Sequence, residues 1–129
     1  MLVRPGSGEL VTDEPRRQVE VKADRDELAV TESRYAEGES GPVPHFHREH
    51  SDCFFVLEGE LVFELDGKRT EARTGDFIAV PPMVVHTFRN EGPGDARFLN
   101  LHAPSKGFVQ HLREGGDPDR FDTFDPSER

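Results

Sequence analysis

The chain contains the stretch Pro44-His45-Phe46-His47-Arg48-Glu49-His50-Ser51-Asp52, which combines three histidines with two carboxylates. Histidine is the commonest metal ligand among the side chains, and its charge changes near neutral pH. A further histidine, His86, lies in a strand-like run later in the chain. We therefore expect His45, His47, His86 and Asp52 to meet inside a small β-barrel and hold one divalent transition-metal ion.

The spacing within this stretch predicts how the four side chains approach one another. Alternate residues of a strand share a face, so His45 and His47 point the same way. Asp52 and Phe54 also share a face, but with the opposite parity. A turn or bulge over residues 48–51 would reset the parity and lay two strands side by side. Asp52 would then come close to both histidines.

The strand that begins at Asp52 is apolar on both faces, because residues 53–57 read Cys-Phe-Phe-Val-Leu. Such a strand should be covered on both sides. A second subunit is one way to cover the outer face, so we expect a homodimer. Cys53 should face away from Asp52, as a packed core thiol.

Short strands separated by turns account for most of the remaining pattern. Asp66-Gly67 is a strong two-residue hairpin signal. Apolar alternation or short apolar runs predict strands over residues 19–23, 28–35, 52–57, 61–65, 68–72, 77–80, 84–90 and 96–102. This pattern is typical of an all-β sandwich or barrel.

The length of 129 residues predicts one domain, with the barrel over residues 18–104. Residues 1–17 mix Gly, Pro, Ser and charged residues and are expected to form an N-terminal arm. Residues 105–129 are expected to form a short helix and a tail. Ser105 is the candidate N-cap of this helix, and Gly115-Gly116 would end it. The polar tail carries two phenylalanines and would either dock on the barrel or stay disordered.

Composition excludes several classes of partner. The formal net charge is −10, from 26 acidic and 16 basic side chains, which argues against nucleic acid and anionic membranes. No apolar run approaches the ~18 residues of a membrane helix, and residues 1–6 lead into polar sequence without the apolar segment of a signal peptide. The single cysteine fits a reducing compartment. We therefore expect a cytoplasmic protein that binds a small molecule.

Two segments resemble the paired motifs of the cupin superfamily. The first motif, with its His-x-His pair, carboxylate and later glycine, corresponds to His45-Phe46-His47, Asp52 and Gly59. The second motif corresponds to Gly75, Pro81, Met83, His86 and Asn90. The chain departs from the pattern in three places. Asp52 stands where the family usually has Glu, Met83 replaces a glycine, and the glycine ahead of the first motif is displaced.

The resemblance covers about residues 35–102 and extends to small bacterial cupins described as quercetin-dioxygenase-like. It implies a double-stranded β-helix, or jelly-roll barrel, that is often dimeric and holds a metal ion. It also implies metal ligands at His45, His47, Asp52 and His86.

The residue types leave the metal and the role of Asp52 open. Asp is one methylene shorter than Glu, so Asp52 could ligate if the backbone approaches by ~1.5 Å, the length of a C–C bond. Otherwise it would orient a histidine ring. Three histidines suit Zn, and histidines with a carboxylate also suit Fe, Mn, Co or Ni. The alternative is a polar cavity without a metal.

The other histidines are assigned simpler roles. His50 and Glu49 are expected to be solvent-exposed turn residues. The alternative is that His50 turns inward and takes the place of the Glu that the family usually has at the metal site. His102 could line the barrel mouth beside Asn100, but a surface position is favoured. His111 is expected to be solvated.

Three functions remain open. The first is a metal-dependent dioxygenase in which Asp52 acts catalytically, as a ligand or as the proton acceptor from a substrate hydroxyl. Its pocket would be walled by apolar side chains, which could equally be barrel core, and would suit an aromatic or diketone-like substrate. These side chains are Phe54, Val56, Phe63, Phe88 and Met83. The others are an isomerase or sugar-modifying enzyme, and a non-catalytic binding module.

Overall fold

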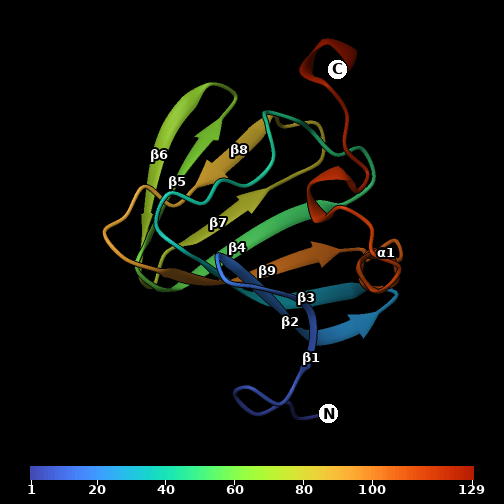
Figure 1. Cartoon of the computed structure of the whole chain (residues 1–129). Coiled ribbons are helices and arrows are strands. Elements are labelled where there is room, and N and C mark those ends of the chain that lie inside the picture. The colour runs from blue at the N-terminus through green and yellow to red at the C-terminus, as the bar shows by residue number, and fades with distance from the viewer.

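The computed structural model describes residues 1–129 and folds about half of the chain into two antiparallel sheets (Figure 1). The strands are β1 (Glu9–Glu14), β2 (Arg17–Arg25), β3 (Leu28–Tyr35), β4 (Ser51–Glu58), β5 (Glu60–Leu65), β6 (Lys68–Arg73), β7 (Phe77–Val80), β8 (His86–Arg89) and β9 (Ala96–Ala103). The larger sheet has the order β1-β2-β3-β9-β4-β7, and the smaller has the order β6-β5-β8. One α-helix, α1 (Phe108–Arg113), and two 3-10 turns, η1 (Pro118–Arg120) and η2 (Pro126–Glu128), follow. The expected all-β jelly-roll with a short C-terminal helix is confirmed.

The core lies between the two sheets and follows the alternation of the strands. Along β4, Asp52, Phe54 and Val56 are buried while the residues between them are partly exposed. The ring of Phe54 packs edge-on against Phe63 of β5, with 4.9 Å between centroids. The buried core consists of Tyr35, Phe54, Val56, Leu61, Phe63, Ala72, Phe88, Ala96 and Phe98.

Local turn chemistry agrees with this arrangement. Asp66 and Gly67 join β5 to β6 with positive φ at both positions, 48° and 81°. A two-residue turn with positive φ at both positions has a backbone twist that matches the twist of the two strands it joins. At Gly59, φ is +73° and a Cβ atom would lie 2.5 Å from the carbonyl oxygen of Asp95. Only glycine fits where the chain passes from β4 to β5.

The histidine stretch does not pair with β4, so that expectation was wrong. His45 instead exchanges backbone hydrogen bonds with His86, at 3.1 and 2.8 Å, and Phe46 does so with Phe124, at 3.1 and 3.0 Å. The two edges of β4 are already occupied by β7 and β9. No free edge remains for the histidine stretch, which forms isolated bridges instead.

The expected N-terminal arm contains a strand that the sequence pattern did not reveal. Residues 9–14 form β1, which pairs with β2 at the edge of the larger sheet. Most of β1 is exposed, and the side chain of Leu10 is 54% accessible. Within β1 only Val11 packs against a core cluster, so the strand shows no apolar alternation.

The C-terminal helix begins later than expected. Its N-cap is Gly107, with φ of 81° and no side-chain capping hydrogen bond, so Ser105 is not the cap. The backbone N–H of Ser105 donates instead to the carbonyl oxygen of Asp26, at 3.0 Å. The buried side of α1 packs on β2 and β3 in a second core cluster, formed by Val19, Val21, Ala29, Phe108, Val109 and Leu112.

The tail after α1 docks on the barrel, which resolves the alternative left open by the sequence. Phe121 packs edge-on against Phe108, with 5.1 Å between ring centroids. Phe124 stacks on Phe46 at 5.6 Å. The tail therefore crosses the end of the barrel at which the histidine stretch lies, and the C-terminus ends beyond it (Figure 1).

The outer face of the larger sheet is apolar over β4, β7 and part of β9, and it is charged over β2 and β3, where Lys22 pairs with Glu20 and Glu32. Cys53 lies on this face and is only partly buried, so the expectation of a packed core thiol was wrong. Strand registers align two rows across this face, the first formed by Val30, Leu101, Cys53 and Ala79 and the second by Leu99, Phe55 and Phe77.

No helix of the chain is both long and apolar enough to cross a membrane.

Candidate metal centre

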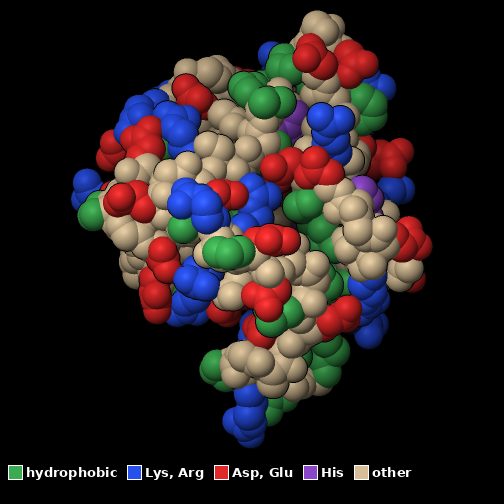
Figure 2. Space-filling view, in the orientation of Figure 1, with side chains coloured by type: hydrophobic (Ala, Val, Ile, Leu, Met, Phe, Trp, Pro, Cys, Tyr) green, Lys and Arg blue, Asp and Glu red, His purple; other side chains and the backbone are tan.

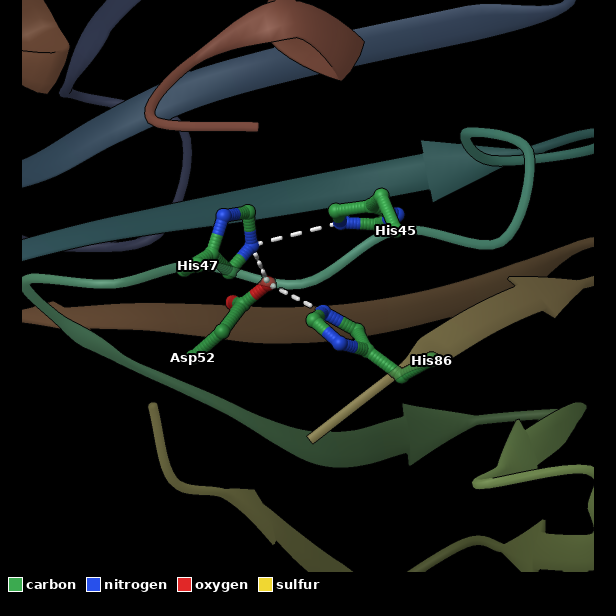
Figure 3. A group of neighbouring side chains, drawn as sticks. All are labelled: His45, His47, Asp52 and His86. Atoms are coloured by element: carbon green, nitrogen blue, oxygen red, sulfur yellow. Dashed lines mark hydrogen bonds and ion pairs between the residues drawn. The ribbon is translucent and has the colours of Figure 1, made fainter. Parts of the chain in front are cut away.

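Four buried side chains converge at one end of the barrel (Figure 3). Nε2 of His47 lies 3.3 Å from Nε2 of His45 and 3.2 Å from Oδ2 of Asp52. Nε2 of His86 lies 3.3 Å from the same carboxylate oxygen. The ligand atoms of the four residues all lie within 4.8 Å of one another. The expected juxtaposition of His45, His47, Asp52 and His86 is present, and the group could hold a metal ion.

Backbone carbonyl groups fix the orientation of the three imidazole rings. Nδ1 of His45 lies 2.8 Å from the carbonyl oxygen of Val43, and Nδ1 of His86 lies 2.9 Å from that of Val84. A carbonyl oxygen can only accept, so each Nδ1 must carry the proton. Nδ1 of His47 makes the same contact with the carbonyl oxygen of Asp122, at 2.7 Å. In the neutral rings each Nε2 then presents its lone pair to the common centre.

This arrangement fits a cation. Burial lowers the pKa of His45 to about 4, so its ring is neutral near pH 7. The contact between Nε2 of His45 and Nε2 of His47 then lacks a proton unless His47 is charged. Burial opposes that charge, but the hydrogen bond and charge of Asp52 raise the pKa of His47 above its ordinary value. A divalent ion would satisfy all three lone pairs and the carboxylate together, which a single proton cannot do.

Asp52 is ionised and uses both carboxylate oxygens. Burial alone would raise its pKa, but His102, His47 and His86 hold the pKa well below its usual range. Oδ2 faces the metal centre, while Oδ1 lies 2.5 Å from Nδ2 of Asn100 and 3.3 Å from Nε2 of His102. Asp52 therefore contacts His47 and His86 although its side chain is one methylene shorter than that of Glu.

His50 is buried, so the expectation of an exposed turn residue was wrong. Its side chain is 0% accessible, and its Nδ1 lies 2.9 Å from Oδ2 of Asp122. The same oxygen accepts the backbone N–H groups of Arg48 and Glu49, at 3.2 and 3.0 Å. Glu49 is exposed as expected. Asp122 thus ties down the turn after His47, and no local pattern in its own segment could have revealed this role.

His102 is also buried rather than on the surface, with 4% of the residue accessible. It stands directly opposite Asp52 in the β4–β9 register. Its ring lies 4.6 Å from that of His50, centroid to centroid. Nδ1 of His102 and Nε2 of His50 are the two buried side-chain atoms without a hydrogen-bond partner. The alternation of β9, with Asn100 on the same face, was the signal for this position.

His111 is half-buried rather than solvated, with Nε2 2.8 Å from the carbonyl oxygen of Asp117. Met83 is 43% accessible and does not wall a pocket. It adopts φ of 74°, the left-handed conformation that favours glycine. Its N–H donates to the carbonyl oxygen of His47, at 2.8 Å, so this turn supports the histidine stretch.

An inner cavity of about 50 Å³ lies beside the four-residue group. Phe54, Phe88 and Phe98 form its apolar side, while the other expected wall residues, Val56 and Phe63, are core and do not line it. An open cleft of about 600 Å³ lies nearby. Asp119 and Thr123 line both spaces. The C-terminal tail is therefore a partition between the cleft and the inner cavity.

Comparison with known proteins agrees with this fold and site. Residues 31–102 match the family model described as the cupin domain. Quercetin 2,3-dioxygenase of Bacillus subtilis is 32% identical over 92 residues, which cover 68% of this chain and 27% of that protein. The matched segment spans between 27% and 48% of the curated relatives.

Solved structures show the same architecture over most of the chain. KdgF from Halomonas sp. superimposes with a TM-score of 0.70 at 24% identity, over 78% of this chain and 90% of that one. The polyketide cyclase RemF from Streptomyces resistomycificus gives a TM-score of 0.67 at 22% identity, over 88% and 96%. At these identities the likeness establishes the fold.

Proposed function

The chain belongs to the cupin family, and on that premise we propose that it is a metal-dependent dioxygenase acting on an aromatic or diketone-like small molecule. The observation that carries this proposal is the convergence of three Nε2 atoms and one carboxylate oxygen beside a cavity walled by phenylalanines. The similarity to quercetin 2,3-dioxygenase over 92 residues supports oxygen chemistry in particular.

Different residues of the chain would bind the metal ion, accept a proton and hold the substrate. His45, His47 and His86 would hold the ion through Nε2, with Asp52 as the fourth ligand through Oδ2. When bound, a divalent ion such as Fe, Mn, Ni or Co supplies the redox chemistry that a reaction with dioxygen requires. Asp52 is ionised and so can also accept the proton of a substrate hydroxyl placed beside it. The phenylalanine wall would hold a flat ring and exclude water.

The lining of the inner cavity favours this reading over a sugar-phosphate isomerase. A phosphate group is usually bound by Arg or Lys. The residues that line the cavity include neither. A sugar-modifying activity on an uncharged substrate, with a histidine as base, remains the alternative, as does a non-catalytic binding module. Product formation from a bound ligand separates the enzymes from the binding module.

We also propose that two copies associate through the outer face of the larger sheet. Apolar side chains from four strands are aligned there, including Phe55 and Phe77 with 6.5 Å between ring centroids. Phe77 is 55% accessible in the single chain. A second copy would cover these rows, because an apolar sheet face in water favours burial.

The remaining partners follow from charge and cysteine content. Figure 2 shows acidic and basic side chains interspersed over the face drawn, and the net charge is −10. This supports a small-molecule partner rather than nucleic acid or an anionic membrane. The single Cys53 supports a cytoplasmic location.

The deciding experiment is the metal content of protein purified without an affinity tag, compared with that of His86→Ala. We expect about one equivalent of metal in the wild type and a clear loss in the variant. His111→Ala is the matched control, because His111 lies outside the four-residue group. Oxygen consumption with phenolic and diketone substrates then tests the reaction. A wild type that lacks metal and cannot be loaded with it would refute the dioxygenase.

A further inference from the structure

Strand β3 turns a row of hydroxyl groups toward the inner cavity. Thr31, Ser33 and Tyr35 occupy alternate positions of the strand, so they share its inner face. All three are buried, with 2%, 5% and 5% of each residue accessible. All three also line the inner cavity. We call these three residues the β3 hydroxyl row.

The hydroxyl row has no partner within the chain. None of the three hydroxyl groups makes a hydrogen bond within the chain. Their oxygen atoms are not among the fully enclosed side-chain atoms without a partner, which are Nε2 of His50 and Nδ1 of His102. They therefore open onto the cavity that the three residues line. The neighbouring Asn100 is different, because its Nδ2 donates to Asp52 and to the carbonyl oxygen of Cys53. The hydroxyl groups of β3 can therefore hydrogen-bond with water or with a ligand that enters the cavity.

The strand registers place this row relative to the metal centre. Asp52 stands opposite His102, and the next inward-facing level pairs Asn100 with Thr31. Ser33 and Tyr35 lie on the two following levels, each about 7 Å further along the strand at ~3.4 Å per residue. A molecule held at the metal centre and extended into the barrel would therefore pass along the hydroxyl row.

The hydroxyl row is flanked by phenylalanines. Phe98 pairs with Ser33 in the β3–β9 register, and Phe88 of the smaller sheet packs against Phe54 with 4.9 Å between ring centroids. No Lys or Arg lines the cavity. Such a lining suits a flat, neutral molecule with oxygen atoms along one edge, because each oxygen can exchange a hydrogen bond with a hydroxyl group.

We propose that the β3 hydroxyl row recognises oxygen groups at the end of the substrate remote from the metal centre. The inference rests on the proposed function, because it concerns the same cavity, and it specifies the substrate class. That class is a neutral aromatic compound with oxygen at two ends, one for the metal centre and one for β3. A cavity of about 50 Å³ holds only a few water molecules, so Phe121 and Thr123 of the tail must yield to admit it.

The test compares two catechols that differ only at the remote end, 4-(hydroxymethyl)catechol and 4-ethylcatechol. Binding to the metal-loaded protein is measured by titration calorimetry. We expect the wild type to bind the hydroxymethyl compound about tenfold more tightly, the value of one good hydrogen bond. The double variant Thr31→Val/Ser33→Ala should lose most of this preference, because only the Tyr35 hydroxyl of the row remains. Thr70→Val, on β6 and outside the cavity, should keep the wild-type ratio.

A second measurement needs no ligand. Unfolding of the metal-free proteins is followed by circular dichroism, and the double variant should have an unchanged or higher midpoint than the wild type. Loss of hydroxyl groups that the fold uses would lower it. A lowered midpoint, an unchanged preference in the double variant, or failure of both catechols to bind would each overturn the proposal. If the wild type prefers the hydroxymethyl compound but consumes no oxygen, the proposed role of the hydroxyl row stands and only the dioxygenase is refuted.

Discussion

The carbonyl oxygen of Asp122 lies 2.7 Å from Nδ1 of His47, across 75 residues of sequence. The C-terminal tail thereby sets which nitrogen of this ring carries the proton and directs Nε2 toward the centre. The carboxylate of Asp122 also anchors the turn after His47, through His50 and two backbone N–H groups. A residue outside the barrel thus supports the candidate metal centre.

Replacing Asp122 by Ala should weaken metal binding without removing a ligand. The backbone carbonyl remains, but the turn and the tail lose the carboxylate that joins them. Loss of such supporting contacts typically costs about 10–100-fold in metal affinity, and we expect faster metal loss to a chelator. Asp125→Ala is the control, because its side chain caps η2 in the same tail. Equal rates of metal loss in the two variants would contradict this role.

Asp52→Asn tests the carboxylate itself. The histidines around Asp52 hold its pKa well below its usual range, so the wild-type side chain is charged near neutral pH. Asn keeps the shape but removes the charge, and we expect at least a tenfold loss of metal affinity together with loss of oxygen consumption. Asp95→Asn, at an exposed carboxylate paired with Arg34, serves as the control. Unchanged metal content and turnover in Asp52→Asn would rule out both roles of Asp52.

Patterns that repeat over neighbouring residues were readable from the sequence. The alternation of β4 and the Asp66-Gly67 turn correctly predicted a buried strand and a hairpin. His45 and His47 share a face by the same rule and do meet. These features depend on the spacing of residues that are close together in the sequence, so the sequence alone predicts them.

Contacts made by the tail were not readable in this way. His50 looked like a turn residue because nothing near it in sequence shows that Asp122 covers it. His102 looked like a surface residue because its partner, Asp52, is on another strand. β1 was missed because only one of its side chains, Val11, packs against a core cluster. Each of these outcomes is decided by distant pairing rather than by local pattern.

Met83→Gly should stabilise the protein slightly. Met83 adopts a left-handed backbone, with φ of 74°, at a strain cost of about 1–2 kcal/mol for a residue with a side chain. Glycine relieves this strain but loses about 0.5–1 kcal/mol through the greater freedom of the unfolded chain. We expect a net gain of up to about 1 kcal/mol in the free energy of unfolding. Met83→Ala keeps the strain and should show no gain in the same denaturant titration.

Phe77→Asp tests the proposed dimer. The side chain is 55% accessible in the single chain and belongs to the aligned apolar rows. A charge buried between two copies would be costly, so the variant should sediment as a monomer when the wild type sediments as a dimer. Leu10→Asp, on the exposed edge strand, should leave the assembly unchanged. A monomeric wild type at micromolar concentration would refute the dimer.

His50 should make the stability of the metal-free protein depend on pH. Burial, aided by the neighbouring His102 and His47, lowers the pKa of His50 to about 4, whereas the unfolded chain has an ordinary value of about 6.5. Between these values the unfolded state binds more protons, so stability is full above about pH 6.5 and falls toward pH 4. The expected loss from this residue is about 2 kcal/mol at pH 5.

His50→Asn isolates this contribution, because the Asn amide can still donate to Asp122 but does not titrate. Denaturant unfolding at pH 7.5 and pH 5 gives the loss of stability in each protein, and the other buried groups titrate in both. We expect the wild type to lose about 2 kcal/mol more than the variant over this interval. Parallel losses would mean that His50 is already charged in the folded protein, and that its contact with Asp122 is an ion pair.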